Sequence, residues 1–131
     1  MRRAPVIIEA AVNGNTTKST NPAVPRSPDE IAECALECLD RGAAIVHNHN
    51  DEPNVGGPAR HDPAPYMEAW SQVLAVHPRA LLHPTVRGRS DDAPIEDRYS
   101  HLAALYDADL LPMASADPGI VSIGPFIYGN S

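Results

Sequence analysis

The chain has 131 residues, enough for one domain, and 43% of them are hydrophobic, so it can bury a core. Its 10 basic and 17 acidic side chains give a formal charge of −7 without any basic stripe, which argues against a nucleic-acid-binding surface. No apolar run reaches the roughly 18 residues that span a membrane, and no signal-peptide core follows Met1, so we expect a cytoplasmic protein without a membrane partner.

The first predicted element is a buried strand over Val6–Val12, which ends at the turn residues Asn13-Gly14-Asn15. A polar loop then leads to a strong helix start. Ser27 can cap this helix, Pro28 suits its first position, and Glu30 completes a capping box. The apolar side chains of the helix recur at helical spacing and predict one buried face: Ile31, Cys34, Ala35, Cys38 and Leu39.

The two cysteines, Cys34 and Cys38, lie one turn apart in this helix. They lack the Cys-x-x-Cys spacing of redox and metal sites, so we expect reduced, half-buried thiols. Gly42 stands just past the helix, where a positive φ is often needed.

A short apolar run, Ala43–Val46, predicts a second buried strand that leads directly into His47-Asn48-His49. Because side chains alternate along a strand, His47 and His49 should point to the same side. Two imidazoles at the end of a strand can hold a cation such as zinc. The alternative is a pair of ordinary solvated or hydrogen-bonded histidines, and the residues alone leave both interpretations open.

After a turn-rich loop, a second helix is predicted from Ala64 or Pro65 to about His77, where Pro78 ends it. A third short strand, Ala80–His83, is closed by Pro84. The second helix should bury one stripe: Tyr66, Ala69, Trp70, Val73 and Leu74.

Ser90-Asp91-Asp92 can cap a third helix, which a fourth strand over Leu110–Ser115 would follow, although Pro112 counts against regular pairing. The tail from residue 120 has no assignment. The expected apolar face of the third helix comprises Ile95, Tyr99, Leu102, Leu105 and Tyr106. Three histidines without a strand-end context are interpreted as surface or helix residues: His61, His77 and His101.

The predicted order is β-α-β-α-β-α-β with short links, which indicates a parallel sheet with right-handed crossovers. Such a chain can form a small open α/β sheet. It can equally form the first half of an eight-stranded barrel of about 250 residues. Periodicity does not decide between the two architectures.

Several motifs are distinctive in combination: Ala10–Gly14, Asn21–Ala32, Gly42–His49, and Met113–Gly119 followed by Ser122-Ile123-Gly124. Together they resemble the β-keto acid cleavage enzymes, whose best-known activity is 3-keto-5-aminohexanoate cleavage. The resemblance runs along essentially the whole chain and implies an α/β fold in which parallel β/α units form the first half of a (β/α)8 TIM barrel. Residues 1–131 would then be a single partial TIM-barrel domain of about four β/α units.

The resemblance implies a zinc-dependent transferase. It would cleave a β-keto acid with acetyl-CoA by Claisen and retro-Claisen steps, giving acetoacetate and an acyl-CoA. His47 and His49 would be two zinc ligands. The family's third ligand, a glutamate, and its Arg and Asp for proton abstraction lie late in the barrel, on a segment this chain does not contain, so no catalytic residue is identified here. Because a half-barrel exposes sheet edges, we expect a homo-oligomer.

The resemblance also implies substrate contacts at Asn15, Thr85, Gly88, Ser115 and Asp117. Asn15 stands near the acidic residue that holds the substrate amino group in aminohexanoate-cleaving members, and an amide cannot supply that charge. Thr85 and Gly88 fit a loop that cradles a carboxylate, although turn chemistry alone also explains both. Ser115 and Asp117 fall where family members place polar substrate contacts.

Two residues near the third strand keep alternative roles. His83 is either a further site residue or a structural hydrogen-bonding group. Arg87 either offsets the charge of a carboxylate or of coenzyme A phosphates, or is a solvated surface arginine.

Two other functions remain open. One is another metal-dependent barrel enzyme, such as an amidohydrolase-like hydrolase, although those typically carry His-x-His on the first strand. The other is a catalytically incomplete half-barrel that binds a metal weakly or pairs with a partner.

Overall fold

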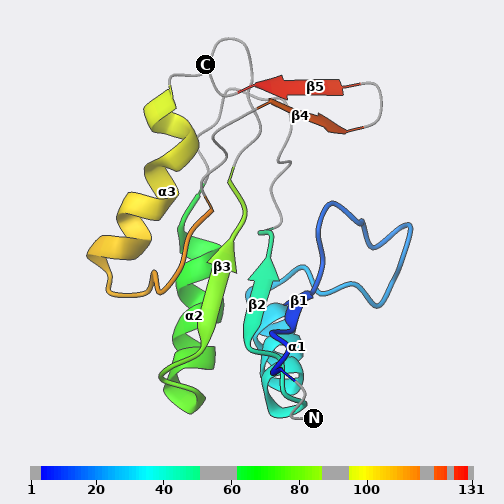
Figure 1. Cartoon of the computed structure of the whole chain (residues 1–131), viewed down its shortest axis with the longest axis vertical. Coiled ribbons are helices and arrows are strands. Elements are labelled where there is room, and N and C mark those ends of the chain that lie inside the picture. Colours follow the sequence, from blue (N-terminus) through cyan, green and yellow to red (C-terminus); the bar gives the residue numbers. More distant parts are fainter. Residues whose placement is uncertain (1–3, 51–61, 87–94, 116–119, 124–125, 130–131) are drawn as a thin grey trace.

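A computed structural model describes residues 4–50, 62–86, 95–115, 120–123 and 126–129 (Figure 1). These residues form three β/α pairs followed by a short hairpin. The strands are β1 (Glu9–Ala11), β2 (Ile45–Asn48), β3 (Leu81–Pro84), β4 (Ile120–Ile123) and β5 (Phe126–Gly129). The helices are α1 (Pro28–Asp40), α2 (Ala64–Val76) and α3 (Ile95–Asp107).

The three β/α pairs build a parallel sheet in the order β1-β2-β3. Its register aligns Ala11 with His47 and His47 with His83. The predicted α/β class and parallel pairing are therefore confirmed. Within the described residues the sheet is open, because β1 and β3 each pair on one side only.

Helices α1 and α2 lie on the same side of this sheet (Figure 1). The sheet side chains that face these helices, Val46, Asn48 and Leu82, are fully buried. The alternating positions, His47 and His83, lie on the opposite face, which we call the open face, and are only partly buried. One face thus carries the core and the other faces away from it.

The start of α1 has the predicted capping box. The Ser27 side chain accepts from the Glu30 backbone N–H, and the Glu30 carboxylate accepts from the Ser27 backbone N–H. Past the end of the helix, Gly42 has φ +98°, a conformation that glycine adopts without strain. Cys34 and Cys38 are free and half-buried, as expected.

Helix α2 begins at Ala64, and the carboxylate of Asp62 before it accepts from the Ala64 N–H at 2.9 Å. Its predicted stripe is confirmed for the four residues nearest the sheet, and Leu74 packs at the margin. The resulting core joins α1, β2, α2, β3 and α3 and consists of Ile31, Ala32, Ala35, Val46, Tyr66, Ala69, Trp70, Val73, Ala80, Leu82 and Leu105.

The prediction of a buried first strand over residues 6–12 is wrong in extent and in burial. The strand itself spans only Glu9–Ala11, and Val6, Ile7 and Ile8 are exposed. The segment lies at the edge of the described sheet, and an apolar run does not show on which side a neighbour will lie.

The predicted fourth strand over 110–115 is also wrong. After α3, Asp109 adopts φ +58°, and the Leu110 N–H donates to the Leu105 carbonyl. The first residues of this segment therefore form the C-terminal cap of α3. Pro112 cannot donate to a ladder, which disfavours a strand there. Instead, the unassigned tail contains β4 and β5, an antiparallel pair separate from the parallel sheet.

The buried face of α3 is rotated from the predicted one. Tyr106 is 73% exposed, whereas His101, interpreted as a surface or helix residue, lies in the helix and is fully buried beside Tyr66. Leu105, four residues after His101, is buried as predicted. The predicted stripe through Tyr99, Leu102 and Tyr106 is offset from the line through His101 and Leu105, and only packing selects which side of the helix is buried. The cap predicted at 90–92 and His61 lie outside the described residues.

Within the described residues, no helix combines the length and apolar character needed to cross a bilayer.

Candidate metal centre

The two predicted histidines lie at the carboxyl end of β2. His47 is in the strand and His49 follows it directly. Their rings contact edge to face, with centroids 5.1 Å apart. The expectation that both side chains lie on the same side is therefore met, because the backbone stays extended through Asn48.

The hydrogen bonding of His47 defines its tautomer. Its Nδ1 donates to the backbone carbonyl of His83 at 2.9 Å, so Nε2 carries the lone pair. Histidines that bind metals commonly donate their second nitrogen to a carbonyl or carboxylate in this way. His47 is thus oriented as a metal ligand would be.

Both rings are kept neutral by their surroundings. Burial lowers the pKa of His47. Burial also lowers the pKa of His49 to about 4, with smaller contributions from the charges of His47 and Arg26. A neutral imidazole is the form that binds a metal, so neither histidine must first lose a proton at neutral pH.

A third histidine and a carboxylate join this pair on the open face. The ring of His83 lies 4.8 Å from that of His47, centroid to centroid. His83 Nδ1 donates to the Glu9 carboxylate at 3.1 Å, which leaves Nε2 to accept from the Ser115 hydroxyl. His83 is therefore a residue of the site.

These contacts define two overlapping sets of metal donors that share His47. One is the predicted pair of His47 and His49. The other comprises Glu9, His47 and His83, whose donor atoms all lie within 4.8 Å of one another. Imidazole and carboxylate donors suit zinc, so the residues present fit such an ion. Both nitrogens of His83 already bond, one to Glu9 and the other to Ser115, so a metal ion on the second set would have to displace one of these partners.

The sequence pattern does not single out Glu9 as a site residue, although Glu9 is a charged residue inside a predicted buried strand. Its place in the site depends on parallel register: Glu9 aligns with Ile45, two residues before His47. A glutamate inside an apolar run is visible in the sequence. Its place beside His47 becomes apparent only when the neighbouring strand β2 is known.

A buried network supports the residue between the two histidines. Trp70 Nε1 donates to the Asn48 side-chain oxygen at 2.8 Å, and the Tyr66 hydroxyl reaches the Asn48 carbonyl at 3.4 Å. The Asn48 amide in turn donates to the His49 carbonyl at 3.3 Å. Helix α2 thereby stabilises Asn48, the residue between the two histidines, from the side of the sheet opposite the open face.

The predicted substrate residues are only partly brought together. Ser115 reaches the site through His83. Thr85 lies half-buried just after β3, where its carbonyl accepts from His101 Nε2 at 2.9 Å. Asn15 is exposed in the loop after Gly14. Three further residues, Arg87, Gly88 and Asp117, lie outside the described residues.

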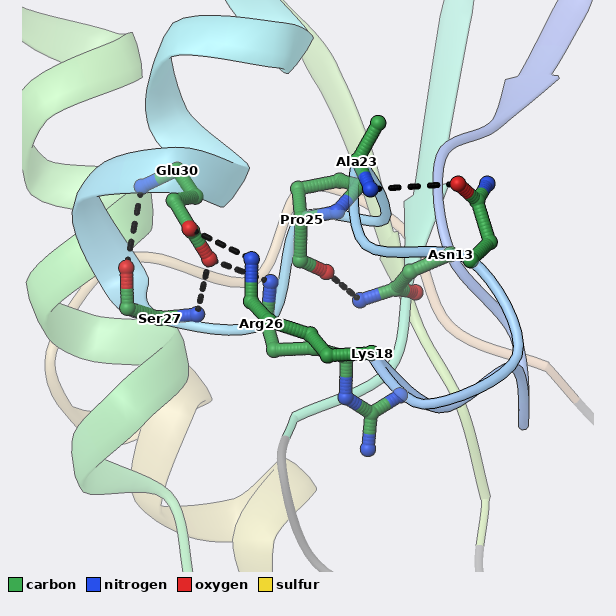
Figure 2. A network of polar contacts seen from close by, with 8 residues as sticks. Asn13, Lys18, Ala23, Pro25, Arg26, Ser27 and Glu30 are labelled. Carbon is green, nitrogen blue, oxygen red and sulfur yellow. Dashed lines mark hydrogen bonds and ion pairs between the residues drawn. The ribbon is translucent and has the colours of Figure 1, made fainter.

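The loop that carries Asn15 is anchored at several points (Figure 2). Arg26 Nη1 donates to the Gly14 carbonyl at 2.9 Å. Lys18 pairs with Glu30 at 2.6 Å, and Glu30 also accepts from the Arg26 backbone N–H. The loop between β1 and α1 is thus tied to the N-terminus of the helix.

These features define an α/β protein with a histidine-rich site, suited to a divalent metal ion, at the carboxyl ends of parallel strands. The family model for the beta-keto acid cleavage enzyme matches residues 5–131. The chain belongs to the beta-keto acid cleavage enzyme family, which confirms the resemblance found in its motifs.

Curated relatives agree with this assignment. The chain is 46% identical over 56 residues to a 3-dehydrocarnitine:acetyl-CoA trimethylamine transferase of Rhizobium meliloti, covering 42% of this chain and 19% of the relative. It is 38% identical over 71 residues to a 3,5-dioxohexanoate:acetyl-CoA acetone transferase of Paraburkholderia graminis, covering 53% and 23%. It is 30% identical over 121 residues to a 3-keto-5-aminohexanoate cleavage enzyme of Fusobacterium nucleatum, covering 91% and 41%. The chain therefore spans less than half the length of these relatives.

Proposed function

We propose that the protein takes part in zinc-dependent cleavage of a β-keto acid with acetyl-CoA, giving acetoacetate and an acyl-CoA. The observation that carries the proposal is the orientation of His47, whose Nδ1 donates to the His83 carbonyl while Nε2 and the neighbouring His49 lie on the open face. Family membership and the acetyl-CoA named for two relatives support the reaction class.

Zinc held by these histidines would supply the positive charge that stabilises negative charge developing on a keto oxygen. The protein residues orient and bind. His47 and His49 present neutral imidazoles, and His83 orients the Ser115 hydroxyl. Ser115 and Thr85 are the proposed substrate contacts within the described residues, with Gly88 and Asp117 proposed beyond them. Asn15 is neutral, so the substrate should lack the cationic group of an aminohexanoate.

The open face also fits a place in the wall of a (β/α)8 barrel, of which these residues form a partial domain. In that architecture the face opposite the helices is the barrel interior, and the strand ends carry the chemistry. Exposed apolar residues support the proposal, because Val6, Ile7 and Leu81 lack cover. Further β/α units, or another copy in a homo-oligomer, would cover them.

The metal assignment is tested by zinc content in native mass spectrometry. We expect stoichiometric zinc in the wild type and none in His47→Ala or His49→Ala. His77→Ala is the matched control, since His77 pairs with Asp40 at the helix ends, away from the site. Glu9→Gln separates the two donor sets and should keep its zinc. If folded H49A retains zinc while E9Q loses it, the metal site is instead the set of Glu9, His47 and His83.

Turnover is tested by incubating the protein with acetyl-CoA and a panel of neutral and anionic β-keto acids. Formation of acetoacetate together with a new CoA ester supports the proposal. A protein that carries no zinc and forms heterogeneous aggregates would instead support the incomplete half-barrel.

Hydrolysis is the second candidate function, favoured by one observation. Glu9, His83 and Ser115 form a hydrogen-bonded chain of carboxylate, imidazole and hydroxyl, the order found in nucleophilic hydrolases. A hydrolase would release acetate and free CoA from acetyl-CoA without any β-keto acid, and Ser115→Ala would abolish that release. Formation of new CoA esters in the presence of a β-keto acid would exclude hydrolysis as the function of Glu9, His83 and Ser115.

A further inference from the structure

Asn13, two residues after the end of β1, makes four hydrogen bonds through its side-chain amide and is only 9% exposed. Its Nδ2 donates to the His49 carbonyl at 2.8 Å and to the Pro25 carbonyl at 3.0 Å, the second of which Figure 2 shows. Its Oδ1 accepts from the backbone N–H groups of His49 and Gly14, each at 2.8 Å. The two donors and the two lone pairs of the amide are therefore all used.

Two of these bonds go to the N–H and the C=O of one residue, His49. A side-chain amide that pairs with both peptide groups of a residue replaces the ladder that a continuing strand would supply. The last backbone bond between the strands is Val12 N–H to the His47 carbonyl at 3.0 Å. Beyond that point, the Asn13 side chain makes the next two bonds from this segment to the β2 chain, both to the backbone of His49.

The third and fourth bonds join the same amide to the loop between β1 and α1. Gly14 lies at the start of this loop and Pro25 near its end. The loop carries Asn15, a proposed substrate residue. One side chain thus links the backbone of a proposed metal ligand to both ends of a proposed substrate loop.

We propose that Asn13 is a positioning residue for the metal centre, which holds the His49 backbone so that its imidazole stays beside that of His47. The inference rests on the proposed zinc function. It goes beyond that function by assigning metal-site geometry to a residue that contacts neither metal nor substrate. Aspartate, which has the same shape, lacks both donors of this amide, and alanine would leave the part-buried His49 N–H without this acceptor.

The test compares the full zinc-loaded chain with Asn13→Asp and with Asn21→Asp. Asn21 lies in the same loop and accepts from the Ala23 N–H at 3.1 Å through Oδ1, an interaction that aspartate retains. Both variants add one negative charge to the loop, but only N13D removes the N–H groups that donate to the His49 and Pro25 carbonyls. Zinc affinity is measured by chelator competition, and the geometry of the site by the visible absorption of the cobalt-substituted protein.

We expect N13D to weaken zinc binding about 10- to 100-fold, the usual effect of removing a group that orients a metal ligand. Its cobalt bands should shift, and zinc should raise its Tm less than that of the wild type. N21D should match the wild type in all three measurements. Asn13→Ser, which keeps a small hydroxyl, replaces N13D if the latter does not fold without metal.

Zinc affinity and cobalt bands of folded N13D equal to those of N21D would overturn the inference while leaving the zinc centre in place. A wild type that binds no zinc would overturn the proposed function and this inference together. An equal drop in Tm for N13D with and without zinc, at unchanged affinity, would assign Asn13 to fold stability alone and so would also overturn the inference.

Discussion

The two faces of the β1-β2-β3 sheet differ in what their side chains contact. On the helix-covered face, Val46 and Leu82 are fully buried in the core. On the open face, His47 and His83 are only partly buried. The His47 side chain bonds to the backbone carbonyl of His83, and the His83 side chain bonds to the Glu9 carboxylate. Neighbouring residues of one strand therefore have different roles, one in the core and the other in the candidate site, because side chains alternate across the sheet.

Asn48 shows how the two faces are joined. It lies on the helix-covered face, yet it stands between the two histidines and bonds to Trp70 behind the sheet. A polar side chain in the core is costly unless its hydrogen bonds are satisfied, and here the helix layer satisfies them. Core packing thereby supports the backbone that carries the open-face site.

The largest expected effect contrasts Leu82→Ala with Leu81→Ala. The two leucines are adjacent in β3 and lie on opposite faces of the sheet, so Leu82 is 0% exposed whereas Leu81 is 40% exposed. L82A should lower the free energy of unfolding by about 2–5 kcal/mol through lost burial and a cavity. L81A should cost much less. Urea denaturation measures both, and equal losses would contradict the division into two faces.

A smaller effect is expected from Trp70→Phe, which removes the indole N–H that donates to buried Asn48. Leaving that oxygen without its donor should lower the free energy of unfolding by about 1–3 kcal/mol. Tyr106→Phe is the control, because Tyr106 is exposed. If zinc affinity falls as well in W70F, the helix layer supports the metal centre; an unchanged stability would show that this bond contributes nothing.

The smallest effect concerns Glu30, which belongs to neither face. Hydrogen bonds from Lys18, Arg26 and Ser27, in that order, lower its pKa from 4.5 to about 2. A carboxylate with a lowered pKa in the folded state stabilises above pH 4.5 and loses that contribution as the pH falls towards 2. Stability should therefore decline across this interval in the wild type and less steeply in Glu30→Gln. Parallel profiles from urea denaturation at each pH would contradict the assignment.

Local signals were sufficient for several elements. The start of α1 is predicted by Ser27, Pro28 and Glu30 alone, because a capping box forms within one turn of the helix. His47 and His49 share a side because the strand period is two, whatever their neighbours are. Gly42 likewise marks the end of α1 by its own conformational freedom.

Other features could not be predicted because they depend on which segments become neighbours. Glu9 and His83 join His47 through parallel register, and Asn13 reaches His49 across a separation of 36 residues. The burial of His101 and the exposure of Tyr106 follow from how α3 packs on Tyr66. The chain's own pattern thus determined the three helices, strands β2 and β3, the paired histidines and the family, because these depend on local periods and motifs. The tertiary structure decided the remaining members of the site and their hydrogen bonds, because contacts between distant strands are set by packing and register.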